Sequence, residues 1–142
     1  MSVIGAVSKS VKKVSIPSTV KYKDYTFKVV YIRSSSFRNF KKLSSVSIGS
    51  NVASIGPRAF QNCKMLSSVK IGRDVAKIGN YAFYGTEKKL KNVKIYSARL
   101  HEVGKKAFDQ SRSNAVIKVP SSKLRTYKKL LKDKGIKKVV KF

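Results

Sequence analysis

One apolar pattern recurs along the chain at a fixed spacing. It reads Leu-x-x-Val-x-Ile-x-x-x-Val-x-x-Ile-Gly-x-x-Ala-Phe, first from Leu43 to Phe60 and again from Leu66 to Phe83. Every matched position lies 23 residues further on (66 − 43, 83 − 60). A period of this length predicts a solenoid, in which each repeat buries its apolar face only against its neighbours. Such a fold offers an extended surface in place of a closed catalytic pocket.

Two altered copies bring the number of repeats to about four. The third copy runs from Leu90 to Phe108, shifted by 24 to 25 residues (90 − 66, 108 − 83). The earliest copy is split between Val11–Ile16 and Val29–Phe37, with about nine residues inserted between the two parts. Insertions at corners cost little free energy, because loop-closure entropy grows only with the logarithm of loop length.

The inserted segment predicts a β-hairpin. Thr19–Val29 alternates in polarity on both sides of Lys23-Asp24, which places the turn at these two residues. Tyr22, Tyr25 and Tyr31 lie in or beside the insert. Exposed aromatic rings among lysines stack on sugars or bases, whereas in hairpins they more commonly pack across the strands. We favour packing and keep both alternatives open.

Within each repeat the spacing indicates a short strand followed by two bends. Val46 and Ile48 are two apart, which predicts a strand with both side chains facing inward. Ile55-Gly56 indicates a second extended bend, and Ala59-Phe60 indicates the start of a short helical or 3₁₀ turn that drives the ring inward. Stacked copies are expected to form parallel ladders of Val, Ile and Phe.

The repeat resembles that of the BspA-like leucine-rich repeat family of bacterial cell-surface proteins. Phe60-Gln-Asn-Cys63 completes the family's motif, and Ile16-Pro17 resembles its Ile-Pro pair. The sequence departs from the motif at Gly49 and Gly72 (for proline), Arg33 (for glycine), and Thr86 and Ser111 (for cysteine). The resemblance implies a leucine-rich-repeat right-handed β-solenoid with short helical turns, a role in surface attachment and no catalytic residue.

A single domain over 1–142 is expected, with repeats over 11–114 between two caps. Residues 1–10 form an N-terminal cap or tail, in which we expect Val3–Val7 to be a loosely held strand. Residues 115–142 read as strand, helix and strand: Ala115–Val119, a helix capped by Ser121 or Ser122 and running through 134, and a return over Ile136–Phe142, with Gly135 as the helix C-cap.

The predicted C-terminal helix carries one apolar stripe, formed by Leu124, Tyr127, Leu130 and Leu131. We expect this stripe to seal the last repeat, because an open solenoid end exposes apolar core. An interface for a partner helix is the alternative.

Charge is the strongest functional signal after the repeat. The chain has 33 Lys and Arg against six Asp and Glu, a net charge of +27, which predicts attraction to polyanions. The solenoid would stack outward residues in two rows, Ser15-Ser47-Lys70-Lys94 and Lys13-Ser45-Ser68-Asn92. Our candidates for a ligand-binding face are Ser47, Lys70, Lys94, Asn92 and Lys13. The alternative is a solvated face whose lysines block edge aggregation.

Catalysis has little support in the sequence. The acidic residues are scattered, and no pair has a spacing that suggests acid–base chemistry. We expect the lone His101 to be structural or solvated, and the single Cys63 to be a small core residue. No metal-ligand cluster or phosphate-binding loop is visible in the sequence, so neither a metal nor a cofactor is expected.

These observations favour a non-enzymatic surface interaction or adhesion module. Its partner would be a protein, a glycan or an anionic cell-wall polymer, bound by a monomer through one solenoid face. A basic intracellular nucleic-acid-binding protein and a purely structural repeat segment of a larger surface protein are the alternatives. We expect an extracellular or cell-surface location; the first residues are too weakly apolar for a signal peptide, so an excised mature region is envisaged.

Overall fold

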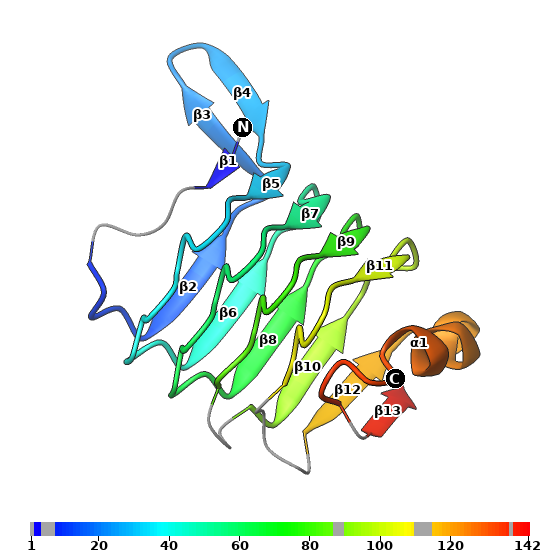
Figure 1. Ribbon diagram of the computed structural model, residues 1–142. Helices are drawn as coiled ribbons and strands as arrows, with labels where there is room; N and C mark the ends of the chain where they lie inside the picture. Colours follow the sequence, from blue (N-terminus) through cyan, green and yellow to red (C-terminus); the bar gives the residue numbers. More distant parts are fainter. Residues whose placement is uncertain (1, 4–7, 87–89, 110–114, 137) are drawn as a thin grey trace.

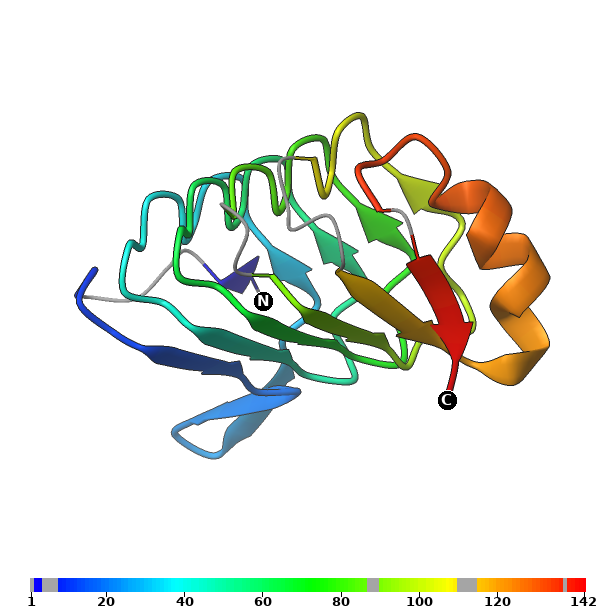
Figure 2. The same cartoon turned by 90° about the horizontal axis from the view of Figure 1, so that it is seen from below.

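The computed structural model describes residues 2–3, 8–86, 90–109, 115–136 and 138–142, and forms a β-solenoid with two parallel sheets. The six-stranded sheet contains, in spatial order, β13 (Lys138–Lys141), β12 (Val116–Val119), β10 (Asn92–Ile95), β8 (Ser68–Ile71), β6 (Ser45–Ile48) and β2 (Lys13–Ile16). The five-stranded sheet contains β1 (Ser2–Val3), β5 (Tyr31–Ile32), β7 (Ser54–Ile55), β9 (Lys77–Ile78) and β11 (Glu102–Val103). The chain winds through both sheets in each repeat (Figures 1 and 2).

The strand register confirms the spacing that the sequence predicts. Val46 of β6 pairs with Val69 of β8, and Val69 pairs with Val93 of β10. Within β6 and β8 the side chains alternate between buried valine or isoleucine and more exposed serine or lysine. This alternation follows from the two-residue period of a strand with one face on the core. The Ile55-Gly56 bend contains a genuine strand, β7, so the repeat builds two sheets.

A stack of four phenylalanine rings fills the interior. Phe37, Phe60, Phe83 and Phe108 are all buried. Successive ring centroids lie 5.1, 5.2 and 5.1 Å apart, and the ring planes differ by only 4–5°. The near-parallel arrangement results from the parallel strand register, which places the same residue at the same height in each repeat. The predicted ladder is therefore confirmed.

The segment leading to each phenylalanine is a run of turns, not the helical or 3₁₀ turn that was expected. Arg58 and Asn62, on either side of Ala59-Phe60, have φ values of 56° and 59°, in the left-handed region, which leaves no room for a right-handed helical turn. The Phe60 N–H donates to the Ala82 carbonyl of the next repeat at 2.8 Å, and not to its own turn. The same left-handed φ recurs in phase at Ser35, Tyr81 and Lys106.

The inserted segment forms the predicted hairpin, with β3 (Thr19–Tyr22) antiparallel to β4 (Tyr25–Lys28). Lys23 adopts a φ of 52° and so takes the turn conformation usually left to glycine or asparagine. The Val29 N–H donates to the Ser18 carbonyl at 2.8 Å and closes the base of the hairpin. The hairpin projects from the β2 end of the stack (Figure 1).

The C-terminal segment has the expected order but a shorter helix. A 3₁₀ turn, η1 (Ser121–Lys123), precedes α1 (Leu124–Leu130), and turns follow up to Gly135. Neither serine is the N-cap: Pro120 precedes the 3₁₀ turn and Lys123 precedes α1. Ser121 Oγ donates instead to the Phe142 carbonyl at 3.2 Å. The helix lies at the end of the stack, beyond β11 (Figure 2).

Tyr127 attaches that helix to the last repeat. Its ring is 1% exposed. Its hydroxyl donates to the Ser97 carbonyl at 2.9 Å and accepts the Leu100 N–H at 3.0 Å. Burial raises the pKa of this phenol. Leu131 is also buried, whereas Leu124 and Leu130 pack partly against the core, so the stripe seals the repeat as predicted.

At the N-terminus, Ser2–Val3 forms β1 and pairs with β5. The rest of the strand expected over Val3–Val7 lies outside the described residues, as does Ser111.

Candidate functional site

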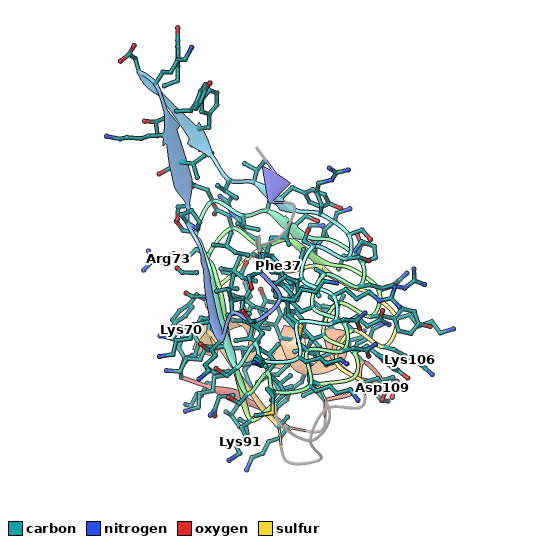
Figure 3. All side chains as sticks on the ribbon, turned by 90° about the vertical axis from the view of Figure 1, so that its left-hand side faces the viewer. Phe37, Lys70, Arg73, Lys91, Lys106 and Asp109 are labelled. Atoms are coloured by element: carbon teal, nitrogen blue, oxygen red, sulfur yellow. The ribbon has the colours of Figure 1, made fainter. Side chains whose placement is uncertain are left out.

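Three of the five candidate residues stand in one continuous row on the outer face of the six-stranded sheet. Ser47 pairs with Lys70, and Lys70 pairs with Lys94. Seen along the stack, Lys70 points away from the interior that holds Phe37 (Figure 3). Because neighbouring parallel strands lie about 4.8 Å apart, the side chains of one row are immediate neighbours.

The row is longer than the sequence analysis proposed. Lys94 also pairs with Lys118 of β12, which in turn pairs with Val140 of β13. Lys118 was missed because β12 was assigned to the cap and not to the repeats. Its signal was present, since Ile117-Lys118-Val119 has the same alternation as Val93-Lys94-Ile95. We call Lys70, Lys94 and Lys118 the lysine row.

The other two candidates lie in the neighbouring row but not beside each other. Lys13 pairs with Ser45, and Ser68 pairs with both Ser45 and Asn92. Lys13 and Asn92 are therefore separated by two serines. All five candidates share one outer face, but only Ser47, Lys70 and Lys94 are consecutive.

This face is strongly basic. Its outward positions include Lys13, Lys70, Lys94, Lys118 and Lys138, and the six strands contain no acidic residue. Like charges directly opposite each other on parallel strands repel. The lysine row therefore costs stability unless an anion lies across it.

The outer face of the five-stranded sheet is different. Its central row runs from Tyr31 through Ser54 and Lys77 to Glu102. Lys77 Nζ lies 2.9 Å from Glu102 Oε2. That hydrogen bond, together with the positive charge of Lys77, lowers the pKa of Glu102. Lys77 therefore has a counter-ion in the neighbouring strand, Glu102.

Cys63 is a buried core residue, as predicted. Its Sγ donates to the Phe37 carbonyl at 3.1 Å, and it is completely buried. Burial raises the pKa of the thiol to about 12, so the nucleophilic thiolate is scarce at neutral pH. Thr86 takes the same position one repeat later, and its buried hydroxyl has no hydrogen-bond partner within the described part of the chain.

His101 is exposed, and within the described part of the chain its ring is recorded with a backbone carbonyl and not with an orienting carboxylate. Its Nδ1 lies 3.0 Å from the Arg99 carbonyl, while the adjacent Glu102 is held by Lys77. A shallow depression of about 560 Å³ beside it is lined by Lys129, Lys132 and Lys134 among others. Among the described residues, no three His, Cys, Asp or Glu side chains come together as a metal site.

The hairpin tyrosines, for which packing across the strands is predicted, lie opposite each other in register at Tyr22 and Tyr25 but are largely exposed. Tyr22 is 65% exposed, Tyr25 67% and Phe27 39%. Tyr25 and Phe27 contact each other, with centroids 6.3 Å apart, and both rings stay partly open to water. The polarity pattern located these residues; whether a core covers them depends on where the hairpin projects.

The comparisons with known proteins agree with this architecture. A leucine-rich repeat protein from Bacteroides ovatus is 26% identical, with a TM-score of 0.65 over 90% of this chain, and the chain spans 33% of that protein's length. The leucine-rich repeat protein of T. pallidum, 18% identical, shares the fold with a TM-score of 0.59 over 97% of this chain and 75% of that one. None of the curated proteins matches.

Among the described residues, no helix has the length and apolarity needed to cross a membrane.

The family description "BspA type Leucine rich repeat region" matches residues 30–140 in six copies. Most of the repeat region is thus accounted for by one family pattern, and the stacked Phe ladder and in-register strands show its structural consequence. The chain belongs to the BspA-type leucine-rich repeat family.

Proposed function

We propose that this chain is a non-enzymatic interaction module of the cell surface that binds an anionic polymer across the outer face of its six-stranded sheet. The observation that carries the proposal is the lysine row: three lysines in strand register, on a sheet whose described strands contain no acidic residue. A linear polyanion suits such a row, because its charges repeat along one direction as the lysines do.

The family supports the general part of this proposal. BspA-type leucine-rich repeat regions are repeat modules associated with interactions and typically with the cell surface, and they are generally non-enzymatic. The finer part, an anionic wall polymer or glycan as ligand and adhesion as the outcome, rests on the lysine row and on the +27 net charge.

A triple substitution tests the site. Lys70→Gln, Lys94→Gln and Lys118→Gln together should weaken binding to teichoic acid or heparin by about 100-fold, if each lysine near an anionic surface contributes about 1 kcal/mol. Lys41→Gln, Lys42→Gln and Lys105→Gln remove the same charge from exposed turns and form the matched control. If both variants lose the same affinity, the loss is explained by net charge alone, and the assignment of the binding site to this face is overturned.

A comparison of affinities at physiological salt separates this function from nucleic-acid binding, and a salt titration gives the number of phosphates neutralised. On duplex DNA, log affinity against log salt should fall with a slope of about −0.9 per phosphate neutralised. If duplex DNA is bound much more tightly than teichoic acid at physiological salt, the nucleic-acid alternative replaces the surface function.

A purely structural segment is the second candidate, because the chain spans only a third of the Bacteroides ovatus protein that it resembles. Failure to bind teichoic acid, heparin or matrix proteins at physiological salt would favour it.

A further inference from the structure

The hairpin β3–β4 has one aromatic face and one polar face. Cross-strand pairing places Val20 opposite Phe27 and Tyr22 opposite Tyr25, so these four side chains share a face. The opposite face carries Thr19, Lys21, Thr26 and Lys28. Such an amphipathic ribbon ordinarily lies with its apolar face on a core.

Here the apolar face is open over most of its length. Val20, at the base, packs against the core. Tyr22, Tyr25, Phe27 and the following Val30 are four of the seven large hydrophobic residues that are exposed in the described chain. Their concentration within residues 22–30 marks a local patch, and an exposed patch of this kind indicates a binding site.

The repeat does not require the hairpin. Three residues, 49–51, turn the corner between Ile48 and Val52. Twelve residues, 17–28, take the same corner between Ile16 and Val29. Solenoid packing therefore explains the base of the insert, through Val20 and the Ser18–Val29 hydrogen bond, but leaves its aromatic tip without a structural role.

The size and charge of the patch indicate which class of ligand it can bind. A folded protein partner needs about 20–30 residues on each side of a stable interface, whereas the patch consists of four, Tyr22, Tyr25, Phe27 and Val30. A second copy of the chain also brings its own charge of +27, which repels association. A single sugar ring, by contrast, needs only one or two aromatic rings, because its C–H bonds pack flat on them.

The polar groups around the rings favour an acidic sugar. Lys23 lies over the Tyr22 ring, with Nζ 5.7 Å from the centroid, and Lys21, Lys23 and Lys28 outnumber the single acid of the hairpin, Asp24. The two tyrosine hydroxyls add hydrogen-bonding groups at the rim. We infer that the exposed aromatic face of Tyr22, Tyr25 and Phe27 is a stacking site for the sugar rings of an anionic polysaccharide, separate from the lysine row.

A comparison of polymers tests this inference on the full chain. The probes are alginate, with carboxylates on sugar rings, poly-glutamate, with carboxylates and no sugar, and single-stranded oligo-dT. Tyr22→Thr, Tyr25→Thr and Phe27→Thr together should weaken alginate binding about tenfold, the smaller end of what an aromatic platform contributes per stacked base. Poly-glutamate binding should stay unchanged. Tyr96→Thr with Phe142→Thr, at an exposed aromatic pair elsewhere, is the control and should affect neither.

Two further measurements keep the result decisive. Replacement of 17–28 by Gly-Ser-Asn, the corner found at 49–51, should reproduce the selective loss, with an unchanged circular dichroism spectrum showing that the solenoid is intact. In the native chain, alginate oligomers should shift the amide resonances of 19–28. Equal losses on alginate and poly-glutamate, or no loss on either, would overturn the inference, and a larger loss on oligo-dT would show base stacking instead. Glutamine substitutions in the lysine row should weaken alginate and poly-glutamate alike, so the failure of one site is distinguishable from the failure of the other.

Discussion

The two sheets of the solenoid come from the same repeat, yet their outer faces differ in charge: one pairs a lysine with a glutamate, and the other places lysines next to one another. On the five-stranded sheet, Lys77 meets Glu102 in the adjoining strand at 2.9 Å. On the six-stranded sheet, Lys70 meets Lys94, and Lys94 meets Lys118. Both positions point outward and leave the core unaffected, so packing does not decide between these arrangements. The lysine row is therefore not required by the packing of the repeat.

The sheets also end differently. The six-stranded sheet continues past the last repeat with β12 and β13, whereas the five-stranded sheet stops at β11. Helix α1 lies at that end (Figure 2), attached through Tyr127. One sheet therefore presents a longer outer face, and the other has its last corner joined to a helix.

The largest expected effect tests whether the two sheets are one cooperative structure. Phe83 is completely buried between Phe60 and Phe108, so Phe83→Ala should lower the free energy of unfolding by about 3–5 kcal/mol. Hydrogen exchange should speed up in β8 and β9 together, because both sheets enclose this ring stack. Phe83→Leu, with a smaller volume change, is the control and should cost less. Loss of protection in one sheet alone would show that the two faces unfold independently.

A smaller effect is expected where the sheets end. Tyr127→Phe removes the hydroxyl that serves both the Leu100 N–H and the Ser97 carbonyl. Leaving buried polar groups unpaired should cost about 1–3 kcal/mol in thermal or urea unfolding. Tyr25→Phe removes an exposed hydroxyl and should be near neutral. If the two variants melt alike, the helix is not held by this contact.

Sequence reasoning recovered what the repeat itself determines. Residues such as Val46, Phe60 and Cys63 recur at fixed spacing, and burial follows directly from that spacing. The left-handed turn at Arg58 was not predicted, because arginine is not a residue type that usually adopts a positive φ. The second sheet was predicted only as a bend, since strands of two residues such as β7 are too short for an alternation to show.

The candidate site was partly predictable for the same reason. Lys70 and Lys94 were found because they share a position in the repeat, whereas Lys118 lies where the repeat spacing changes. The exposure of Tyr22 and Tyr25 was not predictable, because polarity alternation identifies a face but not whether anything covers it.

The charge contrast between the sheets can be reversed by one substitution. Lys94→Glu places an acid between Lys70 and Lys118, and should raise the free energy of unfolding by about 0.2–1 kcal/mol at low salt. The gain should fade towards 1 M salt, where the screening length is about 3 Å. Polyanion binding should fall in the same variant.

Two controls accompany this substitution. Lys94→Gln removes the repulsion without adding an attraction and should lie between the native chain and Lys94→Glu. Lys42→Glu makes the same change in net charge at an exposed turn, so it reports only the relief of overall positive charge. If Lys42→Glu stabilises as much as Lys94→Glu, the row has no local repulsion to relieve.

The smallest effect is expected from the pair on the five-stranded sheet. Lys77 holds the pKa of Glu102 below its ordinary value of 4.5, so the folded state binds a proton at Glu102 less readily than the unfolded state does. The stability from this pair is therefore present above the unfolded pKa and is lost as the pH falls through the folded pKa. The native chain should exceed Glu102→Gln slightly in stability at pH 7, and the difference should disappear in acid. Because both side chains are exposed, the effect on unfolding is small, and a carboxyl titration by NMR is the sharper measurement. A Glu102 pKa at or above 4.5 would mean that Lys77 is not a counter-ion in solution, and the contrast between the two sheets would reduce to the presence or absence of an acidic residue.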